Sequence, residues 1–421
     1  MSQSETVLNG VTYQIPDRPV AVVCIDGSDP EYFTAASKAG VIPTIERFMR
    51  DGFNATAHCV VPSFTCPNNM SIATGSPPEV HGISGNFYLD RKTGEAVVMT
   101  GPELLRSRTV FDVLSKAGVP TVVVTAKDKL RKQLGKDLDV SKGNICFSTQ
   151  HADTTTMEEN GIDDALGFIG QPLPDMYSEE LSLLVLDAGI KFLEQEDKPK
   201  LLYLSLTDYV QHKYAPDHPK ALEFYKAMDD RFARLEELGA IVALVADHGM
   251  RDKCDDDGNY NIIFLQDLLD ERFGKDTTKV ICPITDAFVG HHGALGGFVR
   301  VHCFEGASPE DVIEFTRSLE GIEEVLDRKQ AASTLDLPYD VEADVVVISG
   351  ENYCVGAARA DHDIAGLNGA RLRTHGGFSE QNVPFVLSAP LNADYARRAS
   401  TEQLRNYHIF DFAINGTASA A

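Results

Sequence analysis

Residues 20–26 read VAVVCID, a run of small and β-branched apolar side chains that ends at Asp26. Two further runs have the same form: residues 201–207, LLYLSLT, precede Asp208, and residues 241–246, IVALVA, precede Asp247. Short, continuous apolar runs of this composition are typical of strands buried on both faces of a parallel sheet. They predict the centre of the fold, and each of them brings a carboxylate to the end of a strand.

Segments with helical periodicity alternate with these runs. The helical segments occupy residues 42–50, 110–117, 178–194 and 219–238, and further strands are expected at residues 121–125, 344–349 and 385–388. Alternating strands and helices predict an α/β fold, in which helices flank a mostly parallel central sheet on both faces.

The pattern changes between residues 261 and 338. A strand-like stretch at residues 298–304 precedes a helix start, in which Ser308 suits the cap and Pro309 the first helical position, while Gly321 suits the helix end. We therefore expect a small inserted α+β cap at residues 261–338. Residues 1–260 and 339–421 would form the α/β core.

The composition limits the partners and the compartment. The 421 residues include 63 acidic and 38 basic side chains, so the net charge of −25 argues against nucleic acid or an anionic membrane as partner. The chain has no apolar run of eighteen residues and no cleavable leader, which favours a soluble, cytoplasmic protein. The eight cysteines include no CxxC pair, so reduced thiols are expected.

The three acidic strand ends are expected to converge. In an open α/β sheet, ligands bind beyond the carboxyl ends of the strands, where Asp26, Asp208 and Asp247 would lie. A single aspartate at such a place is more often a turn or helix cap. Three of them with nearby histidines favour a metal site instead.

Three histidines accompany these carboxylates. His212 follows Asp208 by four residues, which is one helical turn, and His248 follows Asp247 directly. His375 precedes two glycines, which permit a close approach of the backbone. Imidazole nitrogens and carboxylate oxygens are suitable zinc ligands, and Thr65 adds a hydroxyl, so the set is large enough for two ions. Manganese or iron would also suit it.

The stretch PSFTCPNNM, residues 62–70, allows two interpretations of Thr65. It is a helix cap before a helix that opens near Pro67, or it is a nucleophile activated by a metal.

At this point the chain resembles the alkaline phosphatase superfamily, in its nucleotide pyrophosphatase/phosphodiesterase-like branch, and within that branch the phosphonoacetate hydrolase family. The resemblance rests on an ordered set of motifs: CIDG, FTCPNNMSIATGSPPEVHGISGN, LTDYVQH, VADHGM and RTHGG. It implies an α/β core with an inserted cap. It also implies two zinc sites, with ligands in two sets: Asp208, His212 and His375; and Asp26, Thr65, Asp247 and His248.

The resemblance further implies roles in catalysis and substrate binding. Thr65 would attack phosphorus and form a phosphothreonine, Asn86 would donate to a phosphoryl oxygen, and His212 would also contact substrate. Lys127 and Lys129, in TAKDKLRK, would bind a carboxylate, and in an extended segment their spacing points both side chains the same way. The alternatives are a turn residue for Asn86 and a solvated basic run for the lysines.

The expected reaction is therefore hydrolysis of the C–P bond of phosphonoacetate, a small anionic phosphonate, to acetate and phosphate. A phosphodiesterase or phosphomonoesterase, and a phosphomutase, use the same site and are the alternatives. A metal-dependent binding protein would have no use for the central hydroxyl. Assembly, with a homodimer as one option, and a contribution of His291 and His292 to the site are left open.

Overall fold

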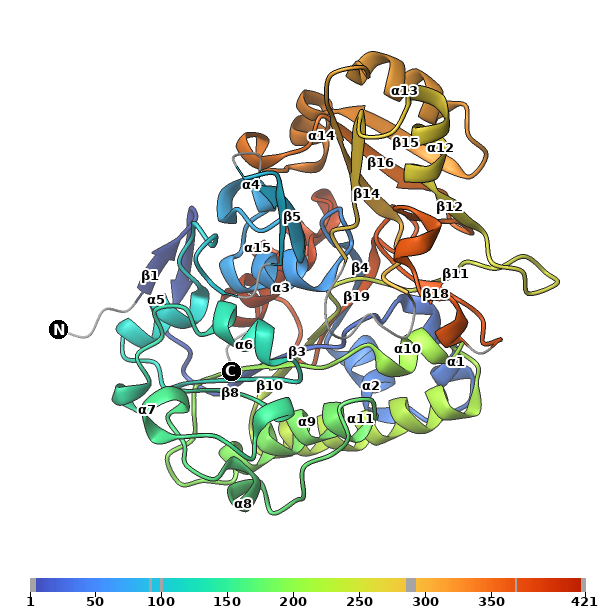
Figure 1. The fold of residues 1–421 in the computed structure, drawn as a ribbon. Helices are drawn as coiled ribbons and strands as arrows, with labels where there is room; N and C mark the ends of the chain where they lie inside the picture. Colours follow the sequence, from blue (N-terminus) through green and yellow to red (C-terminus); the bar gives the residue numbers. More distant parts are fainter. Residues whose placement is uncertain (1–4, 91–92, 99–100, 285–292, 368, 418–421) are drawn as a thin grey trace.

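A computed structural model describes residues 5–90, 93–98, 101–284, 293–367 and 369–417. Its central element is a seven-stranded sheet with the strand order β4–β19–β10–β3–β9–β7–β8 (Figure 1). The strand bounds are β4 (Phe53–His58), β19 (Asn382–Leu387), β10 (Ile241–Val245), β3 (Val20–Cys24), β9 (Leu201–Ser205), β7 (Thr121–Thr125) and β8 (Ile145–Ser148). The five strands from β10 to β8 are parallel, and β19 runs antiparallel to both of its neighbours.

Strand β3 shows why the three apolar runs lie in the middle of this sheet. Val20, Val22 and Cys24 pack into the hydrophobic cluster on one face, and Ala21 and Val23 pack into the cluster on the other. Because both faces are covered, every position of the strand is apolar. The predicted α/β class and its mostly parallel sheet are confirmed.

Helices cover the two faces of the sheet (Figure 1). One face packs against α1 (Pro30–Lys38), α2 (Pro43–Asp51), α8 (Ala165–Ile169), α9 (Glu180–Leu193) and α11 (Pro219–Glu237). The other packs against α3 (Thr65–Thr74), α5 (Val110–Lys116), α6 (Asp128–Leu134), α15 (Ala393–Thr401) and α16 (Ile409–Asp411). Among the residues described, no helix combines the length and the apolar character that crossing a membrane requires.

A second, antiparallel sheet lies at the top of Figure 1, beyond the edge of the core. It has four strands in the order β13 (Thr278–Ile281), β14 (Phe298–Cys303), β16 (Val345–Ser349) and β15 (Ile322–Asp327). Helices α12 (Leu265–Phe273), α13 (Pro309–Arg317) and α14 (Arg328–Leu335) accompany it. Ser308 caps α13 by accepting a hydrogen bond from the backbone N–H of Asp311, as predicted.

Strand β16 corrects one expectation. We predicted a core strand at residues 344–349, yet β16 pairs with β14 and β15 in the second sheet. All five of its residues are buried, so its sequence is as apolar as that of a central strand. The division into a core and a cap at residues 261–338 stays a prediction, and β16 extends the second sheet past residue 338.

Short elements complete the described structure. The remaining helices are α4 (Pro78–His81), α7 (Met157–Asn160) and α10 (Tyr209–Lys213). The two-stranded pairs are β1 (Glu5–Leu8) with β2 (Val11–Gln14), β5 (Phe87–Asp90) with β6 (Glu95–Val98), β11 (Arg251–Asp252) with β18 (Arg373–Thr374), and β12 (Ile262–Phe264) with β17 (Cys354–Gly356).

Candidate active site

The three predicted carboxylates converge at the carboxyl ends of three adjacent strands. Asp26 follows β3, Asp208 follows β9 and Asp247 follows β10, and these strands are parallel neighbours in the sheet. All three carboxylates are buried, with at most 5% of each residue exposed. The convergence expected from the strand ends is therefore present.

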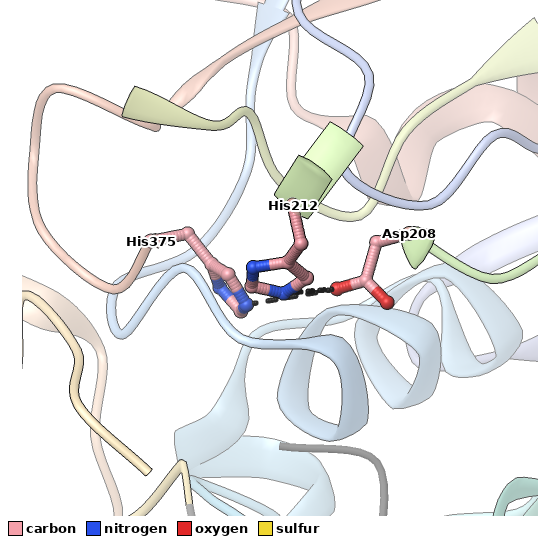
Figure 2. Close-up of side chains that lie close together, drawn as sticks. All are labelled: Asp208, His212 and His375. Atoms are coloured by element: carbon pink, nitrogen blue, oxygen red, sulfur yellow. Dashed lines mark ion pairs between the residues drawn. The ribbon is translucent and has the colours of Figure 1, made fainter. Parts of the chain in front are cut away.

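One group of possible metal ligands consists of Asp208, His212 and His375 (Figure 2). Asp208 is the N-cap of α10, so His212 lies one helical turn further on the same face, and its Nε2 is 3.0 Å from Asp208 Oδ2. His375 follows β18 and approaches from another segment, with its Nε2 3.8 Å from the same oxygen.

The second group consists of Asp26, Asp247 and His248. His248 Nε2 is 3.2 Å from Asp26 Oδ1 and 3.9 Å from Asp247 Oδ2. Within each group the possible ligand atoms all lie within 4.8 Å of one another. The rings of His248 and His375 stack with their centroids 3.5 Å apart, so the two groups adjoin.

The second ring nitrogen of each histidine is already engaged. Nδ1 contacts a backbone carbonyl in all three: Arg373 O for His212 at 2.7 Å, Ser63 O for His375 at 2.7 Å, and Gly249 O for His248 at 2.9 Å. A carbonyl only accepts, so each Nδ1 carries a proton, and Nε2 is the nitrogen that presents a lone pair whenever the ring is neutral. This tautomer is the one that a metal-binding imidazole needs, and the residues therefore fit metal ions.

The charges at the site also favour cations. Burial and the neighbouring Asp26 carboxylate raise the pKa of Asp247 to about 8. Burial alone would lower the pKa of His248, but Asp247 and Asp26 raise it to about 9. Crowded carboxylates of this kind are stabilised by positive charge, which divalent ions supply.

Thr65 lies beside the second group. Its Oγ1 is 3.4 Å from His248 Nε2, and 7% of the residue is exposed. Thr65 is the first residue of α3, and the N-cap is Phe64, whose side chain makes no capping bond. The helix therefore begins two residues before Pro67, and the cap interpretation of Thr65 is wrong. Its hydroxyl stands at the positive end of a helix, where an anion is favoured.

Asn69 is a residue of the site that the sequence analysis missed. Its Nδ2 donates to Asp247 Oδ2 at 3.0 Å and to the Thr65 carbonyl at 3.1 Å. Its Oδ1 accepts from the hydroxyls of Tyr203 and Ser205 on β9. Asn69 thus fixes the Asp247 carboxylate relative to the start of α3. Its place one turn after Thr65 was the available signal.

The lysine pair differs from the prediction. Lys127 is the N-cap of α6 and Lys129 lies inside this helix, so they do not share an extended segment. Lys127 Nζ donates to Asp26 Oδ2 at 2.8 Å and to Asp208 Oδ1 at 3.1 Å, and thus joins one carboxylate of each group. Together with His212, it holds the pKa of Asp208 well below its usual range, although burial would raise it.

Lys129 Nζ is buried and has no hydrogen-bond partner in the described part of the chain. An ammonium in that situation favours binding of an anion. The solvated basic run considered for this stretch does not describe either lysine, because Lys127 is only 5% exposed.

Asn86 is buried between the core and the second sheet. Its Nδ2 donates to Ile284 O at 3.1 Å, and its backbone N–H donates to Pro283 O at 2.7 Å. Ile284 in turn lies near Phe64 and His375, since all three border Gly296. His291 and His292 lie outside the described residues.

A helix-covered parallel sheet that gathers two such groups around a hydroxyl at a helix start is the arrangement of the alkaline phosphatase superfamily. Within that superfamily, the chain belongs to the type I phosphodiesterase/nucleotide pyrophosphatase family, which matches residues 20–368.

Two curated relatives match part of the chain. An uncharacterized pyrophosphatase/phosphodiesterase of Schizosaccharomyces pombe is 26% identical over 254 residues, covering 59% of this chain and 44% of the relative. Ectonucleotide pyrophosphatase/phosphodiesterase family member 1 of Homo sapiens is 27% identical over 251 residues, covering 55% of this chain and 23% of the relative. The chain thus spans less than half the length of these relatives.

Solved structures match nearly the whole chain. Phosphonoacetate hydrolase from Sinorhizobium meliloti, in complex with phosphonoformate or with phosphonoacetate, has a TM-score of 0.93 and 44% identity, covering 99% of this chain and 100% of that one. Murine ectonucleotide pyrophosphatase/phosphodiesterase 5 has a TM-score of 0.64 at 16% identity, covering 96% of each chain, and shares the fold.

Proposed function

We propose that this chain is a zinc-dependent hydrolase that cleaves the C–P bond of phosphonoacetate to acetate and phosphate. The observation that carries the proposal is the convergence of two groups of metal ligands beside Thr65, with Lys127 bonded to one carboxylate of each group. The buried ammonium of Lys129 lies two residues further along the chain. A substrate with a phosphoryl group at one end and a carboxylate at the other suits this combination. The 44% identity to a phosphonoacetate hydrolase supports it over the full length.

In this proposal Asp208, His212 and His375 hold one zinc ion, and Asp26, Thr65, Asp247 and His248 hold the other. Two such ions, when bound, neutralise charge on the attacking and departing atoms of an in-line displacement. The protein contributes the fixed histidine tautomers, the carboxylate oriented by Asn69, and a threonine hydroxyl at the helix start.

Thr65 is the nucleophile of the proposed reaction. Its Oγ loses the hydroxyl proton and attacks phosphorus, so that an O–P bond forms as the C–P bond breaks. The electron pair of the broken bond passes to carbon and is delocalised into the carboxylate as an enolate, which takes a proton to give acetate. Water then attacks the phosphothreonine, phosphate leaves, and the Thr65 hydroxyl is restored.

Three kinds of side chain bind the substrate in this scheme. Lys129 pairs with the carboxylate and the developing enolate. Lys127 donates to Asp26 and Asp208 and adds positive charge beside the bound anion. Asn86 donates to a phosphoryl oxygen, and His212 borders the bound substrate.

A comparison of three substrates tests the proposal. Phosphate release from phosphonoacetate and nitrophenol release from a nitrophenyl monoester and diester are measured with wild type, Lys127→Ala and Lys129→Ala. Lys129→Ala should lower phosphonoacetate turnover by at least about tenfold and ester turnover little, since only phosphonoacetate has a carboxylate. Lys127→Ala should lower the turnover of all three substrates, because Lys127 also orients the metal ligands Asp26 and Asp208.

The family match favours one other function, a phosphodiesterase. Turnover of the diester alone by wild-type protein would support that function and would rule out phosphonoacetate as the substrate. Equal losses on all three substrates in Lys129→Ala would remove the carboxylate role of Lys129.

We further propose a cytoplasmic location. None of the eight cysteines forms a disulfide in the described structure, and seven of them are buried. Thiols in this state suit a reducing compartment.

A further inference from the structure

A buried ion pair joins strand β14 of the second sheet to the loop that precedes β16. Arg300, on β14, donates through Nε to Glu342 Oε1 at 2.5 Å and through Nη2 to Oε2 at 2.8 Å. Arg300 is 3% exposed and Glu342 1%. A buried pair of this kind adds little net stability compared with apolar side chains of similar volume, so its geometry calls for an explanation.

The guanidinium group of Arg300 also reaches into the core. Nη1 donates to the backbone carbonyl of Ser84 at 3.1 Å, and Nη2 donates to Ser84 Oγ at 3.1 Å. Ser84 lies between α4 and β5, two residues before Asn86. The ion pair therefore holds the segment that carries Asn86, with the planar guanidinium fixed by a bidentate carboxylate.

The chain after β13 holds the same segment from another side. Asn86 bonds to the carbonyls of Pro283 and Ile284 through its backbone N–H and its Nδ2. A Cβ on Gly85 would lie 2.7 Å from Pro283 Cβ and 3.3 Å from Arg300 Nη1, so the contact leaves no room for a side chain. Residues 84–86 are thus clamped against the second sheet.

We infer that the Arg300–Glu342 pair positions Asn86 for binding of the phosphoryl group, so that the second sheet sets the geometry of phosphoryl recognition in the core. The inference rests on the proposed role of Asn86 in the reaction. Arg300 and Glu342 act here through the segment of residues 84–86. They are positioning residues, and the clamp links the second sheet region to the proposed substrate-binding segment.

Binding of inorganic phosphate to the zinc-loaded protein tests this inference by titration calorimetry. The variant R300M/E342Q removes both charges. In the wild type the backbone N–H of Ala343 donates to Glu342 Oε1, and the glutamine side chain of the variant keeps an oxygen that can accept this bond. We expect this variant to bind phosphate about tenfold more weakly, the effect of one lost hydrogen bond to a charged group. Ser84→Ala leaves the buried pair intact and should weaken binding about threefold.

Two controls separate positioning from a general loss of structure. Arg328→Met breaks another ion pair of the second sheet region, in which Arg328 Nη2 donates to Asp344 Oδ1 at 2.7 Å, and should leave phosphate affinity unchanged. Asn86→Ala should weaken phosphate binding by itself. Addition of R300M/E342Q to Asn86→Ala should then cause little further loss, because the pair acts through Asn86.

The inference is overturned if R300M/E342Q and Ser84→Ala both bind phosphate like wild type, or if the losses of R300M/E342Q and Asn86→Ala simply multiply. It is also overturned if Asn86→Ala has no effect on phosphate affinity. Failure of the proposed function looks different: wild-type protein would release no phosphate from phosphonoacetate, while phosphate titration would still report on the clamp.

Discussion

At the scale of single residues, hydrogen bonds to the fold orient the side chains of the site. Each site histidine is held through one ring nitrogen, and Asn69 is held through its amide oxygen. The Nδ1 atoms of His212, His248 and His375 bond to backbone carbonyls, so Nε2 is left for a ligand. Asn69 holds Asp247 with the amide nitrogen and is itself held through the oxygen. Preorganisation of this kind lowers the cost of binding metal and substrate.

Removal of the Thr65 hydroxyl should separate metal binding from catalysis. Thr65→Ala keeps Asp26, Asp247 and His248 and should therefore retain metal, yet lose phosphonoacetate turnover by at least about a thousandfold, because the nucleophile is gone. Thr65→Ser keeps a hydroxyl and should retain measurable turnover. Metal analysis and phosphate release check both variants, and full activity in Thr65→Ala would refute the covalent step.

The two lysines should differ in their effect on stability. In metal-free protein, Lys127→Met leaves Asp26 and Asp208 buried without their shared ammonium and should lower the free energy of unfolding by about 3 kcal/mol. Lys129→Met removes a buried ammonium that has no hydrogen-bond partner among the described residues, and should leave this free energy unchanged or raise it. Urea unfolding after chelation measures both, and an equal loss in the two variants would contradict these assignments.

The sequence was informative about residues that end an apolar run or stand one helical turn from another ligand. Asp26, Asp208, Asp247 and His212 could be predicted for that reason. The contact of Lys127 with both Asp26 and Asp208 could not, because it joins side chains 101 and 81 residues apart. Asn69 escaped notice because an amide on a helix has many ordinary uses.

At the scale of elements, the predictions failed where one sequence pattern is compatible with more than one structure. Capping preferences favoured Thr65 as N-cap, but the preceding Phe64 takes that place without a side-chain bond. Strand β16 is buried along its whole length, and that pattern does not distinguish a central parallel strand from one in a covered antiparallel sheet. The presence of the helices and strands was predicted well, because the spacing of apolar residues along the sequence reflects which side chains are buried.

The loop that carries His375 should be sensitive to added bulk. Gly376 has a φ of +134°, and a Cβ there would lie 2.6 Å from Phe64 Cε1 and 2.8 Å from Gly297 N. Gly376→Ala should displace His375 and lower the metal content. It should also lower the free energy of unfolding by at least about 2 kcal/mol more than a control substitution does. The control is Gly239→Ala, where φ is +96° and, among the described residues other than its two chain neighbours, no atom lies within 4 Å of the added Cβ. Equal unfolding free energies in the two variants would argue against a crowded loop.

At the scale of the whole molecule, local charge differs from the net charge. The chain carries −25 overall, yet Lys127 is buried in contact with two of the proposed metal ligands, and the Lys129 ammonium is buried two residues further along the chain. An anionic substrate therefore requires positive charge from the site itself, including its metal ions. The class of fold could be predicted from the chain, whereas the clamp between Arg300 and Ser84 depends on how the two sheets meet.

Metal binding should stabilise the whole chain. Ligands that bind only the folded protein raise its free energy of unfolding, so chelation should lower the melting temperature and zinc should restore it. Two groups of ligands predict saturation at two ions per chain, measured by calorimetric titration of zinc into chelated protein. Saturation at one ion would contradict the two-ion site.

Hydrolysis of the C–P bond can be followed directly by phosphorus and proton magnetic resonance of phosphonoacetate with zinc-loaded wild-type protein. We predict that phosphonoacetate disappears while phosphate and acetate appear in equal amounts, and that Thr65→Ala with the same metal content forms neither. Phosphonoacetate that stays intact with wild-type protein, while a phosphate diester is cleaved, would refute the proposed reaction.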